Sequence, residues 1–211
     1  MTAQSLPHLW LPYSQMALAP LPPTAVSTHG CRIQLADGRE LIDGIASWWS
    51  VAHGYNHPHL ISEVEKQLRL MPHVMFGGLV HEPAKRLAAR LATLTGLSRV
   101  FFSDSGSVAV EVAMKMALQY WRISGKPGKD RFLCFRDGYH GDTLGAMSVS
   151  DPDHSLHKAF RNAVIKQFVI DIPNDEYSLA EFENLLVSFA GNLAAIIIEP
   201  LVQGAGGMKF H

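Results

Sequence analysis

Apolar and polar positions follow three patterns along this chain, and each pattern predicts a different kind of structure. Residues 1–30 have no regular periodicity and contain five prolines, so we expect an extended arm rather than a helix. Residues 31–35 and 40–43 flank an Asp-Gly pair at positions 37–38, which predicts a β-hairpin. From about residue 57 onward, helical and strand patterns alternate.

The alternating region predicts a parallel sheet with helices on its faces. Residues 108–121 are apolar on nearly every side of a helix, which indicates burial against a sheet or a partner subunit. Residues 194–199 are typical of a strand that is buried on both faces. An open α/β fold of this kind binds ligands at the carboxyl ends of its strands. We expect helices at 59–71, 83–95, 108–121 and from a capping box at 178–181 to about 191, and strands at 99–103, 131–135, 164–170 and 194–199.

Composition narrows the function classes. Hydrophobic residues make up 47% of the chain and charged residues 18%, with a net charge of -1, which does not favour binding to nucleic acid or to an anionic membrane surface. Cys31 and Cys134 have no metal-ligand spacing, so we expect free thiols in a reducing compartment and no metal site. No secretion signal opens the chain, and its apolar runs are too short to cross a bilayer. We therefore expect a cytoplasmic protein.

Residues 104–107 (Asp-Ser-Gly-Ser) stand between a predicted strand and the apolar helix. Backbone N–H groups and the helix dipole at such a turn favour an anion such as phosphate. Ordinary helix capping by Asp or Ser explains the same residues. The pattern is neither a Walker loop nor a GxGxxG turn, so a plain nucleotide site is not indicated.

Three further elements carry candidate chemistry. Residues 137–142 place Tyr139 and an imidazole between two glycines, where an aromatic ring could stack on a planar ligand or simply pack in a surface turn. Glu199 ends an apolar strand at the ligand edge of the sheet, where a carboxylate needs a partner. Trp48 and Trp49 could line a pocket or belong to the core.

In this order, these elements resemble the class III branch of the fold type I pyridoxal-phosphate-dependent aminotransferases. The resemblance implies an N-terminal arm followed by the first part of a large, mainly parallel-sheet domain. It implies pyridoxal 5′-phosphate as cofactor, with Gly106 and Ser107 holding the phosphate. Tyr139 would stack on the pyridine ring and border the substrate. The Ile-Glu-Pro at 198–200 matches the end of a strand in this family.

Narrower features resemble the biotin-pathway members of the family: residues 9–13, 47–49, 73–78 and 105–121. This resemblance implies S-adenosylmethionine as amino donor, 8-amino-7-oxononanoate as acceptor, and a homodimer. Tyr13 and Trp48 would contact the substrate, while Asp142 and Glu199 would support the site. Two alternatives stay open, namely another class III transaminase for ω-amino acids, or a non-catalytic remnant that binds phosphate ligands or a partner chain.

The resemblance also predicts what this sequence lacks. The family's Schiff-base lysine and its aspartate at the pyridine nitrogen follow the Ile-Glu-Pro segment, beyond residue 211. The chain's lysines are Lys66, Lys85, Lys115, Lys126, Lys129, Lys158, Lys166 and Lys209, and none lies in a segment that resembles the lysine loop. We therefore expect a fragment without activity of its own, with part of a small domain at 1–56 and an incomplete cofactor-binding domain at 57–211.

Overall fold

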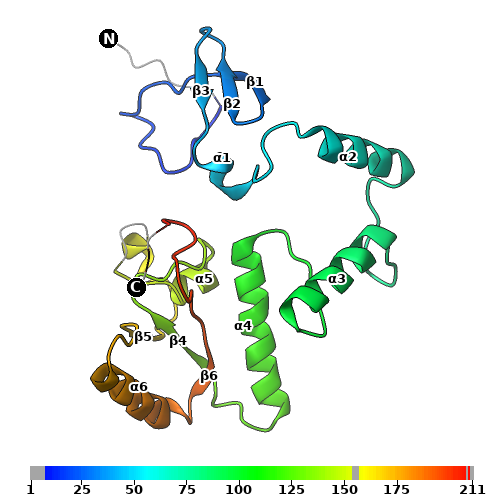
Figure 1. Cartoon of the computed structure of the whole chain (residues 1–211). Coiled ribbons are helices and arrows are strands. Elements are labelled where there is room, and N and C mark those ends of the chain that lie inside the picture. The colour runs from blue at the N-terminus through cyan, green and yellow to red at the C-terminus, as the bar shows by residue number, and fades with distance from the viewer. Residues whose placement is uncertain (1–7, 154–156, 208, 210–211) are drawn as a thin grey trace. The chain divides into compact units, whose positions relative to one another are not determined.

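The computed structural model describes residues 8–153, 157–207 and 209 of the chain. The contacts within it define two compact units, Met1–Arg90 and Leu91–His211 (Figure 1). The boundary that we predict after residue 56 separates the small and large domains of a complete enzyme, and it stays a prediction. The first seven residues of the predicted arm and the end of the chain at 210–211 lie outside the described residues.

The first unit contains an antiparallel sheet in the order β1-β2-β3. Its strands are β1 (Ala25–His29), β2 (Arg32–Leu35) and β3 (Glu40–Ile42). The predicted hairpin is therefore confirmed as β2 and β3. Gly38 has φ +89°, a left-handed conformation that glycine adopts without strain, and the side chain of Asp37 accepts a hydrogen bond from the Arg39 N–H at 3.1 Å. Residues 8–24 contain no helix or strand, as we expect of the arm.

Three helices follow along the chain: α1 (Ala46–Trp49), α2 (Pro58–Leu70) and α3 (Glu82–Thr95), the last of which crosses the boundary between the units. The two long helices confirm the predictions. Helix α2 has Pro58 in its first turn, where the missing N–H is not needed. Helix α3 is followed by Gly96 at φ +72°, a common way for a helix to end.

The second unit is an α/β fold around a parallel sheet in the order β5-β4-β6. Its strands are β4 (Arg131–Phe135), β5 (Phe168–Ile170) and β6 (Leu193–Ile196). Its helices are α4 (Gly106–Ile123), α5 (Leu144–Ser148) and α6 (Glu176–Phe189), with a short 3-10 turn at Lys158–Phe160. No helix in the described part of the chain has the length and apolar character needed to cross a membrane.

The sheet is the middle of three layers (Figure 1). Successive side chains of a strand point to opposite faces, and β4 follows this rule. Phe132 and Cys134 form a buried core with Val149, against which Leu118 and other residues of α4 pack. On the other face, the ring of Phe135 lies 6.0 Å from the ring of Phe182 in α6. Burial without a charged neighbour to favour the thiolate raises the pKa of the Cys134 thiol to about 12.

Four local predictions are wrong or too long. Residues 99–103 form no strand, because the described residues offer no strand with which they pair. The helix α6 begins earlier than predicted, since Asp175 is its N-cap and Ser178 is the third residue of the helix, the N3 partner of Asp175 in the capping box. Strands β5 and β6 are shorter than predicted. Ile196 in β6 is 43% exposed, so burial on both faces does not hold along the whole strand.

Helix α4 is partly buried, on one side only. Val110, Met114 and Trp121 pack on the core, and the indole N–H of Trp121 donates to the carbonyl of Ala194 at 2.7 Å. On the other side, Met116 and Tyr120 are exposed. The expected burial of this helix against a sheet is therefore met in part, because one face packs on the sheet but no residue of α4 is fully buried.

The buried centre of β4 gives a direct test of this packing. Leu133 is fully buried, so Leu133→Ala is expected to lower the free energy of unfolding by about 2–5 kcal/mol, through lost apolar burial and a residual cavity. Leu94 is 82% exposed in α3, so Leu94→Ala is expected to change the free energy of unfolding by less than about 0.5 kcal/mol. Urea unfolding of both variants measures the difference, and equal effects would contradict the assigned core.

Candidate active site

The N-terminal turn of α4 has the properties of an anion site. Ser105 is the N-cap, and its Oγ accepts a hydrogen bond from the Val108 N–H at 3.2 Å. Within the described residues, no hydrogen-bond acceptor faces the N–H of Gly106 or Ser107. A Cβ added at Gly106 would meet nothing within 4 Å. Open space, two unused N–H groups and the positive end of an 18-residue helix together favour a bound phosphate.

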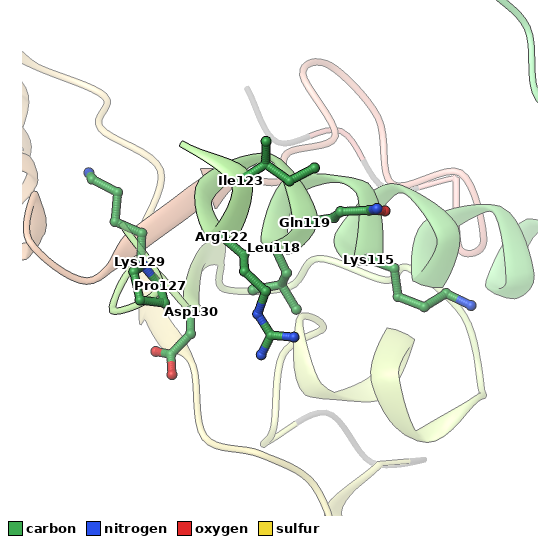
Figure 2. A pocket seen from close by; sticks show the side chains of 8 residues that line it. All are labelled: Lys115, Leu118, Gln119, Arg122, Ile123, Pro127, Lys129 and Asp130. Atoms are coloured by element: carbon green, nitrogen blue, oxygen red, sulfur yellow. The ribbon is translucent and has the colours of Figure 1, made fainter. Parts of the chain in front are cut away.

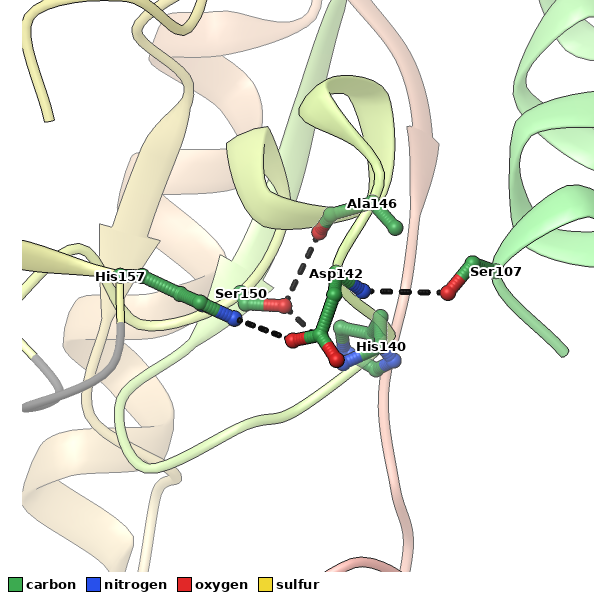
Figure 3. Close-up of polar contacts among 6 residues, drawn as sticks. All are labelled: Ser107, His140, Asp142, Ala146, Ser150 and His157. Carbon is green, nitrogen blue, oxygen red and sulfur yellow. Dashed lines mark hydrogen bonds and ion pairs between the residues drawn. The ribbon is translucent and has the colours of Figure 1, made fainter. Parts of the chain in front are cut away.

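This turn contacts the loop that follows β4. The Ser107 Oγ accepts a hydrogen bond from the Asp142 N–H at 3.0 Å (Figure 3). The approach is close because residue 141 is glycine, since a Cβ there would lie 2.1 Å from the Ser107 Oγ. Gly141 also has φ +125°, a conformation that other residues rarely adopt. The predicted phosphate turn and the predicted ring-stacking loop are therefore neighbours at the carboxyl end of β4.

Glu199 holds the ring-stacking loop from the other side. One oxygen of its carboxylate accepts from the Tyr139 N–H at 2.9 Å, and the other accepts from the Gly204 N–H at 2.7 Å. Hydrogen bonds to a charged group stabilise by about 1.5–3 kcal/mol each. The carboxylate at the end of an apolar strand thus has its partners, and it joins the loop after β4 to the loop after β6.

A buried histidine lies behind Tyr139. The side chain of His157 is 4% exposed, and its ring stacks on the Tyr139 ring with centroids 5.5 Å apart and 20° between the planes. Its Nε2 lies 3.2 Å from Oδ1 of Asp142 (Figure 3). Asp142 therefore contacts the phosphate turn through its backbone and His157 through its side chain.

Two further contacts fix the surroundings of this loop. The His140 N–H donates to the Ser150 Oγ at 2.9 Å, and burial lowers the pKa of the His140 imidazole. In α4, Glu111 accepts from the Gly145 N–H at 3.1 Å, at the start of α5. The Thr143 hydroxyl, followed by the N–H of Gly145, lowers the pKa of the Glu111 carboxyl. The charged carboxylate thereby connects α4 to α5.

The other two predicted site residues, Tyr13 and Trp48, lie in the first unit. Their rings meet edge to face, with centroids 5.8 Å apart at 73°. Both side chains are 64% exposed. Trp48 stands in an unusual turn, because the φ angles of Ala46, Ser47, Trp48 and Trp49 are all positive, between 47° and 74°. Such a left-handed turn costs about 1–2 kcal/mol per non-glycine residue.

Asp43 offsets this cost. Its carboxylate accepts from the N–H groups of Ile45 at 2.9 Å and Ser47 at 2.8 Å, and from the Tyr55 hydroxyl at 2.7 Å. These bonds lower the pKa of the Asp43 carboxyl, with the Tyr55 hydroxyl as the largest cause. Strained backbone of this kind is frequent at functional sites. The Trp48 side chain is thus positioned by a charged anchor near the start of the turn.

Sequence reasoning missed Glu111, His157 and Asp43. The sequence contains a pattern that indicates Glu111, because it follows Ser107 by four residues and so lies on the same face of an otherwise apolar helix. No such pattern indicates His157, since it stands in an irregular segment without periodicity. Asp43 was recognised only as the end of a hairpin strand.

A cavity of about 500 Å³ lies elsewhere in the second unit (Figure 2). It is lined by the second half of α4, including Lys115 and Arg122, and by the loop from Pro127 to Asp130. Lys129 also lines it, but its ammonium already lies 4.4 Å from the centre of the Trp121 ring. No predicted site residue lines this cavity. The candidate site is therefore the group of contacting residues at the carboxyl end of β4, namely Ser107, Tyr139, Asp142, His157 and Glu199.

The profile of the family described as aminotransferase class III matches residues 14–211. The chain belongs to the class III aminotransferases. Members of this family depend on pyridoxal phosphate. The arrangement of the second unit agrees with this result, because a helix N-terminus and an aromatic residue meet at the carboxyl edge of its parallel sheet.

Individual relatives are more specific. The chain is 50% identical to the adenosylmethionine-8-amino-7-oxononanoate aminotransferase of Mycobacterium leprae, over 97% of this chain and 49% of that protein. The crystal structure of the enzyme of that name from Methanocaldococcus jannaschii is 29% identical with a TM-score of 0.88, covering 96% of this chain and 47% of that one. A PLP-bound amine transaminase from an uncultivated Pseudomonas species is 29% identical with a TM-score of 0.81, covering 92% and 48%. The chain spans about half the length of the curated relatives that it matches.

The close approach at Gly141 predicts a sharp effect of one methyl group. Gly141→Ala forces a Cβ into Ser107 and strains the backbone by roughly 1–3 kcal/mol, so affinity for pyridoxamine 5′-phosphate is expected to fall about tenfold or more. Gly128→Ala is the control, because a Cβ there meets nothing within 4 Å and its φ is not positive. Equilibrium dialysis measures both affinities, and similar values for the two variants would contradict this role of Gly141.

Proposed function

We propose that this chain is the cofactor-phosphate and ring-stacking half of an aminotransferase that moves an amino group from S-adenosylmethionine to 8-amino-7-oxononanoate, giving 7,8-diaminononanoate in biotin synthesis. The contact between Ser107 and Asp142 carries the proposal, because it brings the anion-binding turn beside the tyrosine loop. The names of the relatives support the choice of substrates. We also propose that the complete enzyme is a cytoplasmic homodimer.

The residues of the second unit fit pyridoxal phosphate. The N–H groups of Gly106 and Ser107 point from an open helix N-terminus, which suits a phosphate dianion. Tyr139 offers an aromatic face for a flat pyridine ring, and Glu199 and His157 hold that residue in place. When bound, the cofactor supplies the electron sink that lets an amino group leave one substrate and join the next.

Of the remaining assigned residues, Tyr13 and Trp48 would contact the substrate and Asp142 would support the site. Tyr13 and Trp48 form an edge-to-face aromatic pair, whose exposed surfaces suit the apolar chain of 8-amino-7-oxononanoate. Asp142 supports the site indirectly, through its contacts with Ser107 and His157. The lysine that carries the cofactor in this family lies outside the segment that resembles the family here.

The substrate assignment is tested with the protein expressed from its full reading frame. We expect 7,8-diaminononanoate to form from S-adenosylmethionine and 8-amino-7-oxononanoate, detected by mass spectrometry. Replacing the donor by β-alanine, an ω-amino acid, is expected to lower the rate at least about tenfold. Faster turnover with β-alanine would favour the second candidate, a general ω-amino acid transaminase. Binding of pyridoxamine 5′-phosphate without turnover of either donor would favour a non-catalytic remnant.

Two substitutions separate the cofactor role from the substrate role. Tyr139→Ala is expected to weaken pyridoxamine 5′-phosphate binding about two- to tenfold, the size of one aromatic pair of about 0.5–1.5 kcal/mol, whereas Tyr139→Phe retains the ring and the affinity. Trp48→Ala is expected to raise the KM for 8-amino-7-oxononanoate and to leave cofactor affinity unchanged. Tyr177→Ala, at a 72% exposed position in α6, is the control. Unchanged constants in both site variants would contradict these roles.

A further inference from the structure

We propose that His157 is a positioning residue that sets the plane of the Tyr139 ring relative to the phosphate turn, and so determines how a flat ligand stacks there. This inference rests on the proposed function, because it concerns the orientation of the same cofactor. His157 lies in an irregular segment and is not among the site residues that the sequence predicts. Three contacts support the inference, two made by His157 and one made by its partner Asp142.

The first contact is the ring stack. The imidazole of His157 lies nearly parallel to the phenol ring of Tyr139, at 5.5 Å and 20°. An aromatic ring has two faces, and His157 lies over one of them. A planar ligand that stacks on Tyr139 must therefore use the opposite face. The stacked imidazole limits the tilt of the phenol ring, which transmits its orientation to that ligand.

The second contact fixes the imidazole itself. Its Nε2 lies 3.2 Å from Oδ1 of Asp142, a hydrogen bond that sets the rotation of the ring. In the described part of the chain, the other nitrogen, Nδ1, is buried without a hydrogen-bond partner. The Asp142 bond is therefore the one polar contact that orients this ring among the described residues. An apolar side chain of the same size would fill the space but would lose this orientation.

The third contact links Asp142, and through it His157, to the predicted phosphate-binding turn. Asp142 donates its backbone N–H to the Ser107 Oγ at 3.0 Å, in the first turn of α4 (Figure 3). A single residue thus connects the turn that would hold a phosphate with the histidine that stacks on Tyr139. The phosphate and the ring of pyridoxal phosphate are joined by a short CH2–O linkage, so the two protein groups that bind them must stay within a limited distance of each other. Asp142 and His157 maintain that distance from within the second unit.

Substitutions can separate the two contacts of His157. His157→Phe retains a stacked ring and removes the hydrogen bond, His157→Gln retains a polar group for Asp142 and removes the ring, and His157→Ala removes both. In protein from the full reading frame, we expect His157→Ala to weaken pyridoxamine 5′-phosphate binding about two- to tenfold. We expect smaller losses in the other two variants. The affinity for inorganic phosphate should change by less than about twofold in all three, because phosphate has no ring to orient.

The circular dichroism of the bound cofactor gives a readout that a merely structural histidine would not move. The band of the cofactor chromophore depends on how its ring is held, so His157→Phe should alter its sign or intensity at saturating ligand. His59→Ala, at an exposed position in α2, is the control and should leave both affinity and spectrum unchanged.

Each outcome decides the question. An unchanged ring affinity and spectrum in His157→Phe and His157→Ala would overturn the inference and leave the proposed function standing. A parallel loss of phosphate and pyridoxamine 5′-phosphate binding would also overturn it, since that result indicates a general structural role. If the wild-type protein binds phosphate but not pyridoxamine 5′-phosphate, the proposed function itself fails. If His157→Ala does not fold, His157→Phe retains the volume and decides alone.

Discussion

The candidate cofactor site depends on one close approach, in which the first turn of α4 meets the loop that follows β4. Parallel strands bring their carboxyl ends to one edge of a sheet, but a helix terminus and a loop approach this closely only where a side chain is missing. Gly141 provides that gap beside Ser107, and the N–H of Asp142 completes the contact. The anion-binding turn and the aromatic loop therefore meet at one contact, and Glu199 and His157 hold the aromatic loop through Tyr139.

Charged side chains, more than apolar packing, give these segments their shape. Glu199 holds two backbone N–H groups from two loops, and Glu111 holds the start of α5 from the side of α4. Asp43 does the same for the left-handed turn that carries Trp48. A loop buries little apolar surface, so charge-assisted bonds to its backbone are the strongest means of fixing it. The lowered pKa values of the Glu111 and Asp43 carboxyls follow from the same bonds, because both favour the charged form.

The sequence predicts those parts of the fold whose signals are local. The hairpin at Gly38, the helices α2 and α3 and the bounds of β4 follow from turn residues and periodicity alone. Residues 99–103 were predicted wrongly because a strand also needs a partner, and a partner is not a local property. The candidate site divides in the same way. Motifs identified Ser107 and Tyr139, whereas His157 contributes through a contact with no pattern in the sequence.

The positions of the two aromatic groups illustrate different physical solutions. Tyr139 is held by a carboxylate at its backbone N–H and by a stacked imidazole at its ring, in a loop where Asp137 has a positive φ of 60°. Trp48 stands in a left-handed turn that is unfavourable by several kcal/mol in sum, at about 1–2 kcal/mol per residue. The Asp43 carboxylate stabilises that turn through its bonds to the Ile45 and Ser47 N–H groups. The two rings are thus held differently, Tyr139 by contacts to its backbone and its ring, and Trp48 by a carboxylate that binds the backbone beside it.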